Sequence, residues 1–242
     1  MSTPPTTVTG LLARLAALGG RPALTWYGDD GERIELSGAV LDNWVAKTVN
    51  LLAEEFDAEP GSTVVVDLPV GWRQLVWALA AARCGAGVVL LDPTTDAPGH
   101  AGADVVVTSR PLRWPDVDEI VAVALPALAR RFDGELPDGA IDAAAAVMTY
   151  GDVIGLDPAP GAATPLTLLT GDGDPSASTD ADAAGRVLVR GTGTVAQVLS
   201  ACVAVWSAGG SVVLTSVATA AALDADPARR ERLVATEQIT RP

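Results

Sequence analysis

The sequence is nearly devoid of lysine and histidine. Lys47 is the only lysine among its 242 residues, and His100 is the only histidine. A zinc site built from two or more imidazoles is therefore excluded. The sequence also contains no G-x-S-x-G turn, so it offers no serine nucleophile of that type for His100 to activate. His100 lies in a loop rich in glycine and alanine, and we expect it to be a surface residue.

Acidic residues outnumber basic residues by 30 to 16, which gives a formal net charge of −14 and a pI near 4.3. Recognition of nucleic acids and of anionic membranes depends on clustered lysine and arginine side chains. The charge therefore argues against both classes of partner. Because 49% of the residues are hydrophobic, the chain can fold around a substantial core.

Cysteine is also scarce, and both copies, Cys84 and Cys202, fall in predicted apolar helices. A buried free thiol behaves as a small hydrophobic side chain, so we expect no disulfide and a reducing, cytoplasmic location. The N-terminus lacks the basic and apolar segments of a secretory signal, and Thr7 or Thr9 is placed to cap a short amphipathic helix. The uncharged run 191–223 is interrupted by Gly209-Gly210, which favours a helix and a strand over a membrane span.

The stretch 61–93 has the pattern of a complete strand, helix and strand unit. A run of β-branched residues over 64–68 ends at Pro69 and Gly71, and an apolar segment of helical length follows over 72–84. Gly85 is placed to end that helix, and 88–91 forms a second apolar strand before Asp92-Pro93. Two uninterrupted apolar strands joined by a helix predict a parallel pair with both faces covered.

Other segments predict further elements of the same α/β class. We expect a helix over 37–56, strands over 104–108 and 121–125, and an ambiguous alanine-rich segment over 141–148. The last block predicts a strand at 187–190, a helix at 195–208, a strand at 211–215 and a helix from 227 to about 237. This second βαβ unit is expected to extend the first sheet.

The whole chain is thus predicted to be a single α/β domain of layered architecture, with a mostly parallel sheet built from βαβ units. Its expected parts are a front lobe over about 1–132, an acidic connection over about 133–185 and the second βαβ unit over about 186–240.

The order of these motifs resembles the start of the adenylate-forming (AMP-binding, acyl-CoA synthetase-like) superfamily. The residues that carry the resemblance are the strand 23–27, Gly31-Glu32-Arg33, the helix 37–56, Pro60-Gly61, the strand and loop 64–69, Cys84-Gly85-Ala86 and Asp92-Pro93. The segment 36–52 also resembles short actinobacterial proteins that keep only this front part. The resemblance covers residues 20–110 well and 186–240 more loosely, and it implies a truncated form of the superfamily's N-terminal domain.

The catalytic features of that superfamily are missing from the sequence. Its members bind ATP with a Ser/Thr/Gly-rich loop that ends in Pro-Lys, whose amides and lysine neutralise phosphate charge. No such string occurs here, and Lys47 lies in the middle of a predicted helix. The second lysine of the full-length enzymes belongs to a C-terminal domain, which we do not find before Pro242. Neither lysine can be carried over.

The region where the ATP loop is expected is strongly acidic and has no basic residue between Phe132 and Gly185. Unscreened carboxylates repel a triphosphate, so this region is unsuited to that task. Its acidic residues are Asp133, Glu135, Asp138, Asp142, Asp152, Asp157, Asp172, Asp174, Asp180 and Asp182.

A glycine-rich turn is the one candidate nucleotide-binding feature, and it consists of Gly191, Thr192, Gly193 and Thr194. The turn follows a predicted strand and opens a helix, as a G-x-G-x-x-A dinucleotide turn does, and its amides could hold a phosphate. No acidic residue follows about 20 residues later to bind a ribose hydroxyl. A tight strand-to-helix turn that needs glycine for its geometry alone is the competing interpretation.

The acidic segment 172–182 places oxygen ligands at alternate positions, as a calcium loop does. Ala177 and Ala183 stand where such a loop needs glycine and glutamate, so a solvated connection is the simpler interpretation, and we expect no metal site. Five tryptophans are expected in the core, namely Trp26, Trp44, Trp72, Trp77 and Trp206. Trp114, between Arg113 and Pro115, is expected to be exposed and available as a contact residue.

Two hypotheses about function follow. The first is a non-catalytic relative of the adenylate-forming domain, without a cofactor, that acts by binding a small ligand or a protein partner. The second is a nucleotide-binding protein or enzyme that uses the turn at 191–194. The sequence names no converging acids, bases or cations for catalysis, which favours the first. It leaves homo-oligomerisation open.

Overall fold

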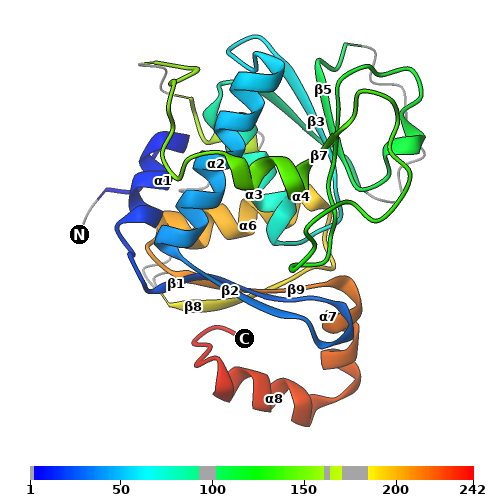
Figure 1. Cartoon of the computed structure of the whole chain (residues 1–242). Coiled ribbons are helices and arrows are strands. Elements are labelled where there is room, and N and C mark those ends of the chain that lie inside the picture. The colour runs from blue at the N-terminus through cyan, green and yellow to red at the C-terminus, as the bar shows by residue number, and fades with distance from the viewer. Residues whose placement is uncertain (1–2, 93–101, 161–163, 171–184) are drawn as a thin grey trace. The chain divides into compact units, whose positions relative to one another are not determined.

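A computed structural model describes residues 3–92, 102–160, 164–170 and 185–242 (Figure 1). These residues form two compact units, each assembled from separate stretches of the chain. Unit 1 comprises residues up to 42, residues 70–72 and residues from 165 onward, and unit 2 comprises 43–69 and 73–164. His100 and the acidic segment 172–182 lie outside the described residues.

Unit 2 is built on a five-stranded parallel sheet with the order β4-β3-β5-β6-β7. Its strands are β3 (Thr63–Asp67), β4 (Gly87–Leu90), β5 (Val105–Thr108), β6 (Ile120–Ala122) and β7 (Ile141–Asp142). The helix α3 (Trp72–Arg83) connects β3 to β4, and residues 74–82 within it are all buried. Gly85 follows the helix with a φ of +80°, which a glycine adopts without strain. The predicted parallel strand, helix and strand unit is confirmed.

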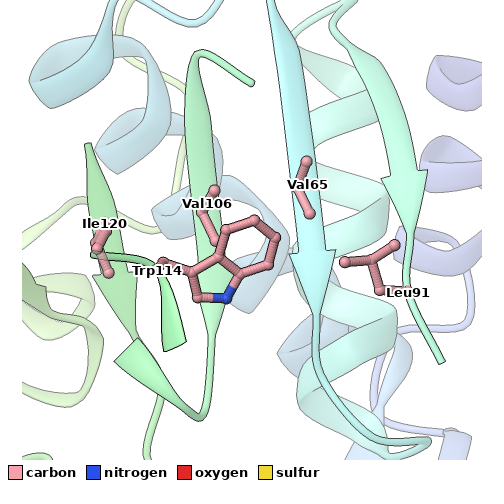
Figure 2. Packing of buried hydrophobic residues seen from close by; sticks show 5 residues of the cluster. All are labelled: Val65, Leu91, Val106, Trp114 and Ile120. Atoms are coloured by element: carbon pink, nitrogen blue, oxygen red, sulfur yellow. The ribbon is translucent and has the colours of Figure 1, made fainter. Parts of the chain in front are cut away.

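A hydrophobic cluster of this sheet is centred on residues that pair with one another across β3, β5 and β6. Val65 pairs with Val106, and Val106 pairs with Ile120, so their side chains share a face. Trp114 and Leu91 pack on these residues, and Figure 2 shows the Trp114 indole beside β5. Trp114 is only 3% exposed. The prediction of an exposed Trp114 is therefore wrong, because the short 3-10 helix Pro111–Arg113 turns the chain back onto the sheet.

Unit 1 contains a separate four-stranded sheet with the order β2-β1-β9-β8. The strands β1 (Pro22–Tyr27) and β2 (Arg33–Ser37) form an antiparallel hairpin, while β9 (Ser211–Thr215) lies parallel to both β1 and β8 (Arg186–Arg190). The expectation that the second βαβ unit extends the first sheet is wrong. Its strand β9 pairs with β1 instead. The four central residues of β1 are all buried, so this strand needs a partner on both edges.

Helices cover this sheet on both faces. The helix α6 (Val195–Ser207) connects β8 to β9, and α7 (Val217–Ala225) and α8 (Pro227–Thr236) follow β9. Figure 1 shows α6 and α8 on opposite faces of the sheet. The helix α1 (Val8–Ala16) begins at the predicted cap Thr7, whose hydroxyl accepts a bond from the Gly10 amide. The helix over 217–225 is an element that the sequence analysis did not predict.

The remaining elements are short, apart from α2 (Gly38–Phe56), which confirms the predicted front helix. They are the 3-10 helices Asp29–Gly31 and Val147–Thr149 and the single-turn helices α4 (Ala143–Ala146) and α5 (Thr167–Thr170). Within the described residues, no helix combines the length and apolar character needed to cross a bilayer.

Four of the tryptophans expected in the core, Trp26, Trp72, Trp77 and Trp206, are buried, while Trp44 is half-buried. Both cysteines are free and buried, as predicted. Burial raises the pKa of Cys84 to about 12 and raises the pKa of Cys202 as well, so both thiols stay protonated at neutral pH.

Candidate functional sites

The predicted turn at 191–194 joins β8 to α6, and its geometry follows from packing and capping. A side chain at Gly191 would place its Cβ atom 2.3 Å from the Thr215 carbonyl oxygen, so only glycine fits there. Thr194 caps the helix: its hydroxyl accepts a bond from the Gln197 amide at 3.2 Å, and the Gln197 side chain accepts one from the Thr194 amide at 3.0 Å. Thr192 and Gly193 are exposed. Nucleotide binding at this turn stays a prediction.

Lys47 lies on α2 and holds a loop of unit 2. Its ammonium group pairs with Asp152 at 2.9 Å and donates a hydrogen bond to the Tyr150 carbonyl. Asn50, nearly one turn further along, donates to the Val153 carbonyl at 2.9 Å and accepts a bond from the Gly155 amide at 3.0 Å. The side chain of Lys47 is only 17% exposed. The single lysine of the chain is therefore part of a structural contact between α2 and residues 150–155.

A buried polar cluster, which we call the Asp67 cluster, lies at the carboxyl ends of β3 and β5. It consists of Asp67, Thr108, Arg110 and Trp114. One oxygen of Asp67 accepts bonds from the Thr108 hydroxyl at 2.7 Å and from the Trp114 indole N–H at 3.1 Å. The other oxygen pairs with the Arg110 guanidinium. Asp67 is 3% exposed, whereas the Arg110 side chain is 31% exposed.

The position of the Asp67 cluster is where parallel sheets commonly bind ligands. The chain enters the sheet at β3, continues to β4 on one side of it, and then places β5 on the other side. In an open parallel sheet, ligands bind outside the carboxyl ends of the strands where the strand order reverses. No motif in the sequence predicts the cluster, and its one local signal is an aspartate directly after three valines of a strand.

A second polar network lies on one face of the unit 1 sheet. Thr25 pairs with Glu35 and Tyr27 pairs with Arg33, so these four side chains share a face. Arg186 lies on the same face, because Leu188, two residues further along β8, pairs with Val213, which pairs with Thr25. Glu237, just after α8, reaches this face and is buried. Its carboxylate accepts bonds from the Tyr27 hydroxyl at 2.5 Å, from Arg33 Nε at 2.9 Å and from Arg186 at 2.5 Å.

The electrostatic balance around Glu237 favours its charged form. Burial alone would raise the pKa of Glu237, but the hydrogen bonds from Arg33, Tyr27 and Arg186 outweigh burial and lower the pKa to about 2. The pKa of Tyr27 is raised, first by burial and then by the hydrogen bond to Glu237. Since Tyr27, Arg33 and Arg186 come from three different strands, Glu237 ties the end of α8 to the sheet.

Among the described residues, no group of three or more histidine, cysteine, aspartate or glutamate side chains is arranged to hold a metal ion. The Asp67 cluster also lacks a carboxylate oxygen without a hydrogen-bond or ion-pair partner. Both oxygens of Asp67 are occupied by donors, so this carboxylate is suited to holding Arg110 in place.

A scan against models of known protein families finds no match to the sequence. A search of characterised proteins finds a TIGR03089 family protein of Mycobacterium tuberculosis (strain ATCC 25618 / H37Rv). It is 34% identical over 252 residues, and the alignment covers 99% of both chains.

Solved structures share the fold at lower identity. An acyl-CoA synthetase of Brucella canis has a TM-score of 0.65 at 20% identity, and the match covers 89% of this chain and 44% of that one. The acetoacetyl-CoA synthetase of Streptomyces lividans gives 0.63 at 16% identity, with 87% and 38% covered. The amide bond synthetase McbA of Marinactinospora thermotolerans gives 0.54 at 19% identity, with 91% and 47% covered. The resemblance to the N-terminal part of the adenylate-forming enzymes is confirmed at the level of the fold, over less than half the length of those enzymes.

Proposed function

The chain belongs to the TIGR03089 family, and from this premise we propose that it is a non-catalytic relative of the adenylate-forming enzymes. In this proposal the protein keeps the α/β fold and acts in the cytoplasm by binding a small ligand or a protein partner. The two buried free thiols support the reducing location.

The observation that carries the proposal is the position of Lys47. Charge stabilisation of a reacting phosphate needs a cation aimed at the place where negative charge develops. Lys47 is the only lysine in the sequence, and its ammonium group is engaged by Asp152 and the Tyr150 carbonyl. It supports a loop, so it is not presented to a nucleotide.

The Asp67 cluster supports binding in preference to catalysis. Both oxygens of its carboxylate are engaged by Thr108, Trp114 and Arg110, so the carboxylate serves to position these groups. What the cluster offers is a guanidinium group held in a fixed orientation at the carboxyl edge of a parallel sheet. A positioned arginine of this kind recognises anionic groups.

The test is an assay of ATP-dependent pyrophosphate release with a panel of carboxylic acids at neutral pH. We expect no release above that of a heat-denatured control. Release that is abolished by Arg110→Gln, or by Thr194→Ala at the 191–194 turn, would overturn the proposal. A thermal-shift screen with nucleotides and acyl-adenylate analogues complements the assay, because a ligand that binds only the native state raises the melting temperature.

A further inference from the structure

The polar face of the unit 1 sheet carries a cavity of about 490 Å³, a size that falls in the range of small-molecule sites. It lies between the strands β2, β8 and β9 and the residues that follow α8. All of its lining residues belong to unit 1. The charged residues that line it are Arg21, Arg33, Glu35, Arg186 and Glu237.

Two of the arginines are held in fixed positions by the glutamates. Arg33 bonds to Glu237 at 2.9 Å and to Glu35 at 2.7 Å, and Arg186 bonds to Glu237 at 2.5 Å. Arg186 also donates to the hydroxyls of Thr25 and Ser211, at 2.8 Å and 3.2 Å. These bonds order two guanidinium groups before any ligand arrives, which lowers the entropic cost of binding.

The cavity still has donors without acceptors. Arg186 Nε is buried and has no hydrogen-bond partner among the described residues. Arg21 makes a single side-chain bond within that part of the chain, from its Nε to the Leu18 carbonyl at 3.4 Å, so its terminal nitrogens stay available. A buried donor without an acceptor is costly. Because Arg186 Nε has no exposed surface, an anion in the cavity meets the terminal nitrogens of the exposed Arg21 first.

The charges of the lining residues add up to one positive charge, since three arginines face two glutamates. This local excess stands out because the whole chain has a net charge of −14. Surrounding negative charge repels anions in general, so an anion is stable here only if it reaches the arginines directly.

We propose that this cavity is a binding site for a small molecule with one anionic group, a carboxylate or a phosphate ester. Arg21 holds the anionic group, the ordered guanidinium groups of Arg33 and Arg186 add positive charge beside it, and the remainder of the cavity holds the uncharged part of the ligand. This inference rests on the proposed binding function, for which it names a ligand class and a site.

The test is an NMR titration of ¹⁵N-labelled protein with two probes, inorganic phosphate and acetate, at constant ionic strength. We expect saturable shifts of backbone amides that line the cavity, such as those of Gly210, Ser211 and Gln238. Arg21→Gln should raise the Kd about tenfold, because it removes a charge-assisted hydrogen bond. The spectrum itself shows whether the variant is folded.

The matched control is Arg230→Gln, which removes the same charge from an exposed position on α8 outside the cavity. It should leave the Kd within about twofold of the parent value, because exposed charges are screened by salt. A response to phosphate alone or acetate alone supports the site and identifies the anionic group.

Three results would overturn the inference: no saturable shift with either probe, shifts that lie outside the cavity, or equal weakening by Arg21→Gln and Arg230→Gln. Each of these leaves the pyrophosphate assay unaffected, so the non-catalytic proposal would stand. Conversely, pyrophosphate release together with saturable anion binding would overturn the proposed function and keep the site.

Discussion

Asp67 is a charged side chain that the fold buries at the end of an apolar strand. A buried carboxylate is tolerated only when donors surround it, and here Thr108, Arg110 and Trp114 supply them. The cost of burial is therefore offset by these three residues together. Removing the Asp67 carboxylate leaves the donors of Thr108 and Trp114 without their acceptor, and both residues are buried.

We predict that Asp67→Asn lowers the free energy of unfolding by about 2–5 kcal/mol, because the new amide N–H₂ faces donors and the Arg110 charge loses its partner. Urea denaturation followed by tryptophan fluorescence measures the change. Asp116→Asn is the control, since Asp116 is exposed, and it should change stability by less than about 0.5 kcal/mol. Equal effects of the two substitutions would show that Asp67 is not an anchor of the sheet edge.

The shifted pKa of Glu237 leads to a prediction about how the stability of the protein depends on pH. This pKa is lowered from 4.5 to about 2 in the folded protein. A lowered pKa contributes stability that is fully present above the unfolded value and is lost as pH falls from about 4.5 to about 2. We expect Glu237→Gln to be less stable than the parent by at most about 3 kcal/mol at neutral pH, with the difference shrinking through that window.

Chemical denaturation of the parent and of Glu237→Gln at several pH values measures this difference. Glu231→Gln, at an exposed position of α8, is the control and should show no such window. A difference between parent and Glu237→Gln that stays constant from neutral pH to pH about 2 would contradict the assigned role of the Glu237 carboxylate.

Single residues of these networks were hard to predict from sequence. Tyr27, Arg33, Arg186 and Glu237 are separated by up to 210 positions, so no local pattern joins them. Trp114 was misjudged for a related reason: its neighbours Arg113 and Pro115 suggest a surface turn, while its burial depends on strands β3 and β5.

At the scale of elements, local patterns were sufficient for most strands and for the long helices. A buried strand is a run of apolar residues, and such runs are visible in the sequence over β3, β4 and β5. The helix α7 was missed because its alanine-rich sequence has little amphipathic pattern. Its cap was present, since the Ser216 hydroxyl accepts a bond from the Thr219 amide at 3.0 Å.

Sheet membership was not predictable in the same way. The pairing of β9 with β1 joins residues near 24 to residues near 212, and strand pairing across such a separation leaves no local signal. Both β9 and β4 are short apolar strands, so either sheet could accept β9 on pattern alone. The actual choice places the polar face of β1, β2 and β8 where Glu237 and the cavity lie.

The helix α3 gives a prediction at this scale, because it is buried on all sides. Leu79 is 0% exposed, and a buried unpaired carboxylate costs several kcal/mol against a typical total stability of about 5–15 kcal/mol. We therefore expect Leu79→Asp to abolish soluble expression. Leu128→Asp is the matched control, since Leu128 is 90% exposed, and it should give normal yield. A folded Leu79→Asp variant with an unchanged melting temperature would contradict the placement of α3.

For the whole molecule, the large negative charge acts against compactness. With 30 acidic and 16 basic residues, folding brings like charges closer together, and salt screens that repulsion over a distance of about 10 Å. Salt also weakens attractive ion pairs, but the pair between Arg186 and Glu237 is largely buried and is screened less. Repulsion should therefore dominate the response of the protein to salt.

We predict that raising NaCl from about 20 mM to about 200 mM at neutral pH increases the melting temperature by roughly 2–4 °C, which corresponds to about 1 kcal/mol for a chain of this length. Calorimetry measures the shift. Near the pI of about 4.3, where the net charge vanishes, the increase should disappear or reverse.

Arg21→Gln should keep the full increase at neutral pH, because screening does not depend on the cavity. Loss of the increase in that variant would instead attribute it to chloride bound at Arg21, and a decrease in the parent would mean that attractive ion pairs outweigh the net charge.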